Sequence, residues 1–273
     1  MPYRTLLVHL DDTPRCGTRV ALAARLAMRQ QSHLIGLAPT GWIEESNQPG
    51  GALGAVQQAQ RTMQTLQMRA RGVAERFEAQ VHQSGLPSFE ARVHEADPLA
   101  SMVLHARNSD LAVVSQSDGT AADFPQQLLM MSGRPVLIVP RHGECADAGQ
   151  QVLVAWNHSR ESARALSDAL PLLAQAQRVE LVFLDQAGSD AAVPEQQMAQ
   201  SCEWLQRHGV PAVSRRILTQ QEAGKALLGE ARQMGADLLV MGAWGHSRLR
   251  EFMLGGATRS MFAHMDLPVL MSH

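Results

Sequence analysis

The chain has 273 residues, of which 45% are hydrophobic and 18% are charged, and its formal net charge is -2 at pH 7. These values are typical of a globular protein with one large domain or two of ordinary size, and the absence of a basic excess excludes nucleic acid as an expected partner. Three cysteines lie far apart and are odd in number, which argues against a disulfide framework: Cys16, Cys145 and Cys202.

The sequence also argues against insertion into a membrane. The opening residues, MPYRTLLVHLDDT, lack the long apolar core of a signal peptide. No apolar run approaches the ~20 residues that a helix needs to cross a bilayer. We therefore expect a cytoplasmic protein that does not associate with membranes.

Strands and helices alternate along the first half of the chain. Apolar runs predict strands near Thr5–Leu10, Leu34–Ala38, Phe89–His94, Leu111–Ser115 and Val136–Val139. Amphipathic segments predict helices near Arg15–Gln30, Leu53–His82, Pro98–Asn108 and Phe124–Met131. In the longest of these helices, apolar residues recur at steps of three and four and predict a core-facing stripe: Leu53, Val56, Met63, Leu66, Val73, Phe77 and Val81.

The second half shows the same alternation. Strands are predicted near Val152–Ala155, Val179–Leu184, Ser214–Leu218, Leu238–Met241 and Val269–Met271. Helices are predicted near Arg160–Ala174, Pro194–His208, Glu222–Met234 and Ala257–His264. The strand runs show little polar alternation, which favours parallel sheets covered on both faces. The predicted fold class is α/β, with an open parallel sheet in each half.

Three segments of the first half recur in the same order in the second. RTLLVHLDDTPRCGTRVALAARLA parallels QVLVAWNHSRESARALSDALPLLA, SDLAVVSQSD parallels ADLLVMGAWG, and RPVLIVP parallels LPVLMSH. Such an ordered recurrence indicates a tandem duplication. We predict domains at residues 1–141 and 150–273, joined by the polar segment RHGECADAG. The pair His142 and Cys145 within that segment is a weak metal signal, because no second pair of ligands follows, and we expect a solvated linker.

A glycine-rich segment follows the predicted strand at Leu238–Met241. Gly242 and Gly245 come first, and nine residues later Gly255 and Gly256 precede a predicted helix that opens with Ala257 and Thr258. Glycine lets the backbone approach an anion closely, and the free N–H groups of a helix N-terminus favour negative charge. The segment is therefore a candidate phosphate-binding loop, although its spacing differs from that of the Walker and dinucleotide fingerprints.

This spacing resembles the Gly-x-x-Gly, nine residues, Gly-Ser/Thr signature of the nucleotide-binding branch of the universal stress protein family. Gly242, Gly245 and Gly255 match the signature, Gly256 replaces its hydroxyl residue, and Thr258 keeps a later hydroxyl. The resemblance implies two tandem five-stranded domains of the adenine nucleotide alpha hydrolase type. It further implies that the domains pair within one chain through their final strands, near Leu137 and Leu270, and that whole chains can form a homodimer.

The resemblance also implies a site for an adenine nucleotide at the carboxyl ends of two strands of the second half. Asn157 aligns with a family Asp that contacts the adenosine part, and an amide can hydrogen-bond to a sugar or a base edge. Asn157 is equally explained as a residue that shapes the turn before the next helix. Phosphate contacts are assigned to backbone N–H groups of the glycine loop and to Thr258.

Residues between the two glycine clusters are further candidates. Arg248 has the geometry to bind phosphate oxygens, whereas Arg250 is better explained by a solvated pair with Glu251. His246 and Ser247 follow Gly245 directly and are second-rank candidates. Trp244 either stacks on a base or covers a hydrophobic edge, and the second is the commoner role of a tryptophan.

The first half lacks this loop. Ser115 and Asp118 replace Gly242 and Gly245, and an acidic residue would repel phosphate. Asp11 retains the carboxylate position of the family and Asp12 adds a second, but turn formation and helix capping explain both. We therefore expect one site in each chain, in the second half.

The sequence thus predicts a tandem universal stress protein that binds ATP, ADP or AMP, with or without Mg²⁺, and acts as a stress-response sensor or regulator through a protein partner that the sequence does not name. The predicted ligand-binding set is Asn157, Gly242, Gly245, His246, Arg248, Gly255, Gly256, Ala257 and Thr258, with no catalytic residue and no protein metal site. Two alternatives remain open, which are a nucleotide-free scaffold and a weak ATP hydrolase.

Overall fold

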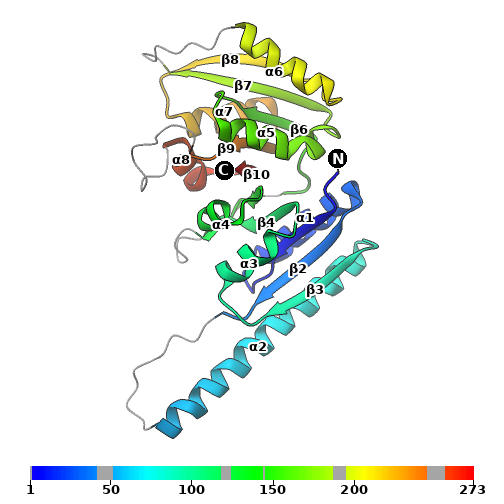
Figure 1. Ribbon diagram of the computed structural model, residues 1–273, viewed down its shortest axis with the longest axis vertical. Coiled ribbons are helices and arrows are strands. Elements are labelled where there is room, and N and C mark those ends of the chain that lie inside the picture. Colours follow the sequence, from blue (N-terminus) through cyan, green and yellow to red (C-terminus); the bar gives the residue numbers. More distant parts are fainter. Residues whose placement is uncertain (1, 42–51, 118–123, 144, 187–194, 245–255) are drawn as a thin grey trace. The chain divides into compact units, whose positions relative to one another are not determined.

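The computed structural model describes residues 2–41, 52–117, 124–143, 145–186, 195–244 and 256–273, which fold as alternating strands and helices (Figure 1). Two compact units are present, one formed by Arg4–Val113 and the other by Met1–Tyr3 together with Val114–His273. The strands are β1 Thr5–His9, β2 His33–Pro39, β3 Phe89–His94, β4 Leu111–Ser115, β5 Val136–Val139, β6 Gln151–Ala155, β7 Arg178–Gln186, β8 Val213–Thr219, β9 Leu238–Gly242 and β10 Val269–Ser272. The helices are α1 Cys16–Gln30, α2 Ala52–Gln83, α3 Pro98–Ala106, α4 Phe124–Ser132, α5 Arg160–Leu173, α6 Glu195–Arg207, α7 Ala223–Met234 and α8 Gly256–His264.

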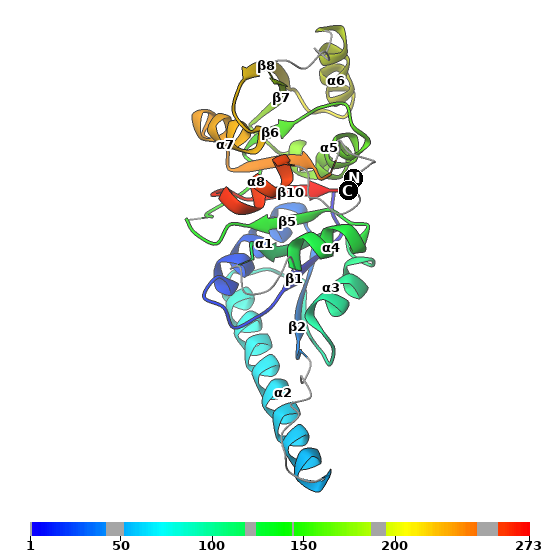
Figure 2. The ribbon, with the colours of Figure 1, turned by 90° about the vertical axis from the view of Figure 1, so that its left-hand side faces the viewer.

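The unit Arg4–Val113 contains a parallel sheet with the strand order β3-β2-β1-β4. Val8 in the middle of β1 lies opposite Gly36 of β2 and Val113 of β4. Helices α1 and α2 cover one face of this sheet and α3 covers the other (Figure 2). The interior residues of β1 and β4 are fully buried, which explains their continuous apolar sequences.

Helix α2 is 32 residues long and packs on β2 and β3 through its C-terminal part. Val73, Phe77 and Val81 are buried there, and the ring of Phe77 lies directly over Gly36. Met63, further towards the start of the helix, is 36% exposed. The expectation that the whole apolar stripe is core is therefore wrong at Met63, whereas the side chains of Leu53 and Val56 lie outside the described residues.

The other unit has the strand order β5-β10-β9-β6-β7-β8. All its neighbouring strands are parallel except β5 and β10, which are antiparallel and place Leu270 opposite Leu137. The expected pairing of the two final strands is therefore present. Helices α5 and α6 lie on one face of the sheet, and α7 and α8 lie on the other (Figure 2).

The predicted elements agree with the observed ones to within a few residues throughout, and the α/β fold class with open, mostly parallel sheets is confirmed. One expectation near the junction of the repeats is wrong. Cys145 and Ala148 are buried, at 5% and 0% exposure, so the segment is not simply a solvated linker. Within the described ranges, no helix combines the length and the apolar character needed to cross a bilayer.

Candidate functional site

The carboxyl ends of β6 and β9 meet at one edge of the sheet. These strands are parallel neighbours, with Val152 opposite Leu238 and Val154 opposite Val240. From β6 the chain proceeds outwards to β7 and β8, and it returns through α7 to β9 on the other side of β6. The strand order therefore reverses between β6 and β9, which is where ligands bind in open α/β sheets.

The loop after β6 is a tight turn that starts α5. The Oδ1 atom of Asn157 accepts a hydrogen bond from the backbone N–H of Ser159 at 3.1 Å. The Oγ atom of Ser159 in turn accepts one from the N–H of Ser162, also at 3.1 Å, and so caps α5. Between them His158 has a φ of 58°, in the left-handed region. Asn157 thus shapes the turn, as one of its two interpretations requires, while its side chain stays exposed.

At the end of β9, Gly242 lies against the first turn of α5. A Cβ atom added at Gly242 would lie 2.4 Å from the carbonyl carbon of Glu161 and 2.5 Å from the nitrogen of Ser162. Because both neighbours are backbone atoms of a capped helix, no side chain can move aside to admit the extra carbon. Gly242 is therefore explained by helix–strand packing, independently of any ligand.

The chain beyond Gly242 turns towards the start of α8. Trp244 has a φ of 62°, and its backbone N–H donates a long hydrogen bond of 3.4 Å to the Oγ1 atom of Thr258. Thr258 is 2% exposed. Its side chain therefore joins the two described ends of the glycine segment, the end of β9 and the first turn of α8.

The N-terminus of α8 faces a less crowded region. Gly256 opens the helix, and an added Cβ there meets no atom of the described residues within 4 Å, while Ala257 is half-buried. Four further residues of the predicted set lie outside the described residues: Gly245, His246, Arg248 and Gly255. The described part of the chain thus places Asn157, Gly242, Gly256, Ala257 and Thr258 in the loops and helix starts that follow β6 and β9.

Comparison with protein families gives one match, in which residues 149–273 fit the Universal stress protein family. This part of the chain is a universal stress protein domain. The match covers β6 to β10 and with them the whole of the edge described above.

Solved structures resemble the whole chain in fold. A universal stress protein from Archaeoglobus fulgidus aligns over 98% of this chain and 97% of its own, with a TM-score of 0.71 and 14% sequence identity. A protein of unknown function from Pseudomonas aeruginosa aligns over 99% of this chain and 92% of its own, with a TM-score of 0.60 and 13% identity. These likenesses show the fold, in which the order of elements occurs twice. A search of curated proteins finds no match.

In the first half of the chain, the equivalent strand end is occupied by an internal ion pair. Asp11 aligns with Asn157 of the universal stress protein domain, and its Oδ2 atom lies 2.9 Å from an Nη atom of Arg19, whose side chain is 1% exposed. The Nε atom of Arg19 also donates to the carbonyl oxygen of His9 at 2.8 Å. Asp11, which occupies the family's Asp position in the first half, is therefore already paired with a cation of the chain itself, Arg19.

The electrostatics of this cluster follow from burial and from the guanidinium. Burial, reinforced by Arg19 and opposed by Asp11, lowers the pKa of His9 to about 3, so its ring is neutral at physiological pH. Burial alone would raise the pKa of Asp11, but Arg19, His9 and hydrogen bonds from Thr13 together hold it below its ordinary value. The N–H and hydroxyl of Thr13 both donate to Asp11 Oδ1, which confirms that Asp11 shapes its turn.

Sequence reasoning did not identify the surroundings of Trp156, the residue between β6 and Asn157. Trp156 and His158 line a cavity of about 590 Å³ between α5 and α6. The available signal was the large aromatic residue directly after a buried strand. Within the described ranges, no group of three or more His, Cys, Asp or Glu residues is arranged to hold a metal ion.

Proposed function

We propose that the universal stress protein domain binds an adenine nucleotide at the carboxyl ends of β6 and β9 and acts as a nucleotide-dependent regulator. The observation that carries the proposal is the adjacency of these strands at the point where the strand order reverses. Each strand leads to the N-terminus of a helix, α5 or α8, and the described part of each intervening loop contains one non-glycine residue at positive φ, His158 or Trp244. Left-handed backbone at such positions often accompanies function.

The chemistry of the described residues suits a phosphate at α8 better than at α5. Ser159 already caps α5 with its side chain, whereas the first turn of α8 begins with Gly256, where no side chain stands. The N–H groups of Gly256 and Ala257, together with the hydroxyl of Thr258, are the proposed phosphate donors. Gly245, His246, Arg248 and Gly255 complete the proposed site on the evidence of the sequence.

Asn157 is the proposed contact for the ribose or the base. Its Oδ1 atom is engaged by the N–H of Ser159, so the amide NH₂ group is the part that a ligand acceptor would meet. Because the amide of Asn157 is neutral, this position adds no negative charge beside the proposed phosphate donors.

The proposed action is binding, with no catalytic residue assigned and at most weak ATP hydrolysis. For binding to regulate a partner protein, the nucleotide must have different affinities for two states of the loop. Hydrogen exchange of residues 242–258 with and without saturating ATP would measure that difference. Unchanged exchange would leave the protein as a nucleotide binder without a switch in this loop.

Calorimetric titration with ATP, ADP and AMP, with and without Mg²⁺, tests the proposal. One nucleotide should bind for each chain, and Gly245→Asp should abolish the heat, because a carboxylate would enter the phosphate site. Gly229→Asp is the matched control, since Gly229 lies within the helix α7 and an added Cβ there meets no described atom within 4 Å. This variant should bind as the wild type does.

A nucleotide-free scaffold is the second candidate, and two observations favour it. Gly242 is required by packing against α5, and Asn157 already has a role in the turn, so neither needs a ligand to explain it. The titration separates the candidates. No heat with any nucleotide, in protein shown to be folded and free of copurified ligand, would establish the scaffold.

A further inference from the structure

A second candidate ligand site lies between α5 and α6, away from the phosphate donors of α8. An open cavity of about 590 Å³ separates the two helices. This volume lies within the roughly 300–1,000 Å³ range of small-molecule sites. Helices α5 and α6 lie on the face of the sheet opposite to α7 and α8 (Figure 2), so a cavity between α5 and α6 is a different feature from the start of α8.

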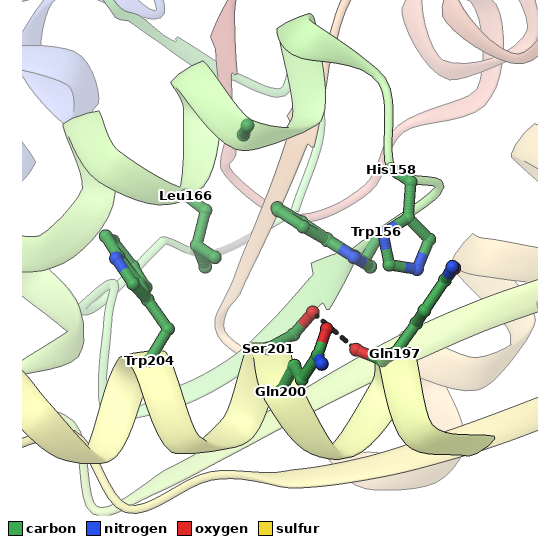
Figure 3. A pocket seen from close by; sticks show the side chains of 8 residues that line it. Trp156, His158, Leu166, Gln197, Gln200, Ser201 and Trp204 are labelled. Carbon is green, nitrogen blue, oxygen red and sulfur yellow. Dashed lines mark hydrogen bonds between the residues drawn. The ribbon is translucent and has the colours of Figure 1, made fainter. Parts of the chain in front are cut away.

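Two tryptophans provide most of the flat apolar surface of the cavity. Trp156 follows β6 and Trp204 comes from the third turn of α6. Figure 3 shows both indole rings facing the cavity, with the side chain of Leu166 from α5 between them. Both tryptophans keep part of their surface exposed, so a planar ring could bury apolar area against each of them.

The indole of Trp156 also offers a hydrogen-bond donor. Its Nε1 atom is buried and has no hydrogen-bond partner among the described residues. A buried N–H group without an acceptor is unfavourable, so a ligand acceptor placed here would gain more than at an ordinary surface donor. Figure 3 shows this edge of the ring towards His158 and Gln197, and both of these side chains are exposed and can move aside.

Among the residues that the structure describes, those that line the cavity carry no formal charge. The remaining described lining residues are Ala163, Gln200 and Ser201, and burial lowers the pKa of His158, which favours its neutral ring. The described lining side chains therefore offer no charge to balance that of an ionic ligand. An uncharged molecule avoids the penalty of leaving water without a counter-ion.

The corresponding helices of the first half, α1 and α2, are in direct contact at this level. Gly17 of α1 aligns with Ala163, and its carbonyl oxygen accepts a hydrogen bond of 2.8 Å from Nε2 of Gln80 in α2. Leu10 aligns with Trp156 and is 2% exposed. One copy of the repeat thus links its two helices by a direct contact at this level, whereas the other keeps an aromatic-lined gap.

We infer that the α5–α6 cavity is a binding site for an uncharged planar aromatic molecule that carries a hydrogen-bond acceptor. The ring lies against Trp156 and Trp204, and the acceptor meets Trp156 Nε1. Neither proposal requires the other: the cavity is lined by α5 and α6, whereas the proposed phosphate donors belong to α8. Asn157, the proposed sugar or base contact, lies in the sequence between the lining residues Trp156 and His158.

Equilibrium dialysis with three probes of similar shape tests this inference. Quinoline has a ring nitrogen that accepts a hydrogen bond, naphthalene has none, and quinoline-2-carboxylate adds a negative charge. We expect saturable binding of one quinoline for each chain, weaker binding of naphthalene and weakest binding of the carboxylate. Trp156→Phe keeps an aromatic ring without the N–H group, and should weaken quinoline about fivefold while changing naphthalene by no more than about twofold.

Two alanines provide a matched blocking pair. Ala163 lines the cavity and Ala199 on α6 does not, and both are exposed, so each should accept a larger residue without unfolding. Ala163→Phe should fill the cavity and abolish quinoline binding, whereas Ala199→Phe should bind as the wild type does. Trp204→Ala should weaken binding about tenfold or more.

The outcomes are distinct for the two proposed sites. Gly245→Asp should leave quinoline binding unchanged, and quinoline should not displace ATP. Absence of saturable quinoline binding would overturn the inference. Equal binding by wild type and by folded Ala163→Phe would overturn it as well, because the probe would then be bound elsewhere.

Discussion

The carboxylate of Asp11 lies 2.9 Å from the guanidinium of Arg19. In the second copy of the repeat the aligned residues are Asn157 and Ala165, so the anion and the cation are both absent. A buried arginine without its carboxylate would be unfavourable, and so would a carboxylate held in place without its cation. In the second copy Asn157 is uncharged and Ala165 on α5 supplies no cation, so neither charge is left without its partner.

Replacing Arg19 by methionine should destabilise the protein, because Asp11 would lose its cation while the methionine preserves most of the packing volume. Because Asp11 keeps some contact with water, we expect a loss on the order of 3 kcal/mol in the free energy of unfolding, at the low end for a broken buried pair. Urea denaturation measures it. The double variant Asp11→Asn with Arg19→Met should lose less than the two single losses added together, and strict additivity would contradict a direct interaction.

Gly242→Ala should destabilise the second half of the chain whether or not a nucleotide binds. The added carbon would lie 2.4 Å from the backbone of Glu161, and overpacking against a rigid backbone costs about 1–3 kcal/mol. Gly256→Ala is the control, because an added Cβ there meets no atom within 4 Å and alanine favours a helix. If both variants unfolded at the same urea concentration, the packing explanation of Gly242 would be wrong.

Gly36 and Phe77 should show strong coupling in a double-mutant cycle. A Cβ atom at Gly36 would lie 2.7 Å from the aromatic ring of Phe77, so Gly36→Ala should cost about 1–3 kcal/mol in the wild-type background. In the Phe77→Leu background the smaller side chain leaves space, and the same substitution should cost clearly less. Equal costs in both backgrounds would show that strand β2 rejects alanine for another reason.

The neutral His9 should make the protein less stable as the pH falls. The pKa of His9 is about 3 in the folded protein against 6.5 as its ordinary value, so between these values the unfolded state binds a proton that the folded state does not. The free energy of unfolding therefore decreases as the pH falls through this window. His9→Gln should flatten part of that slope in urea titrations between pH 4 and 7 (about the middle and upper part of the window). A slope identical to that of the wild type would show that His9 is not held neutral.

Much of the fold could be predicted because its signals are local in the sequence. Continuous apolar runs such as Leu238–Met241 mark buried parallel strands, and the repeated order of segments indicates that both halves share one arrangement. The pairing of the final strands near Leu137 and Leu270 was implied by the resemblance to the universal stress protein family. The helix α2 was placed correctly, but its periodic pattern could not show where the sheet beneath it ends.

The site was less predictable because its geometry depends on contacts between distant residues. The sequence shows that Gly242 is a glycine in a loop, but only the packing of β9 against α5 shows that a side chain does not fit. The gap between Trp156 and Trp204 depends on how α6 packs beside α5 and the end of β6, and the residue spacing within one element does not determine that packing. Asn157 had two interpretations from the sequence, and the hydrogen bond to Ser159 supports one of them without removing the other.

The antiparallel pairing of β5 with β10 has a consequence for any attempt to divide the protein. Cleavage in the segment 141–149 would separate the two strands covalently, but their backbone hydrogen bonds would still hold the fragments together. If the fragment 150–273 were produced alone, the edge of β10 would present unpaired N–H and C=O groups. Such an edge favours pairing with a strand of another chain. Fragments coexpressed in one cell should therefore reassociate, whereas the C-terminal fragment by itself should pair with its own copies.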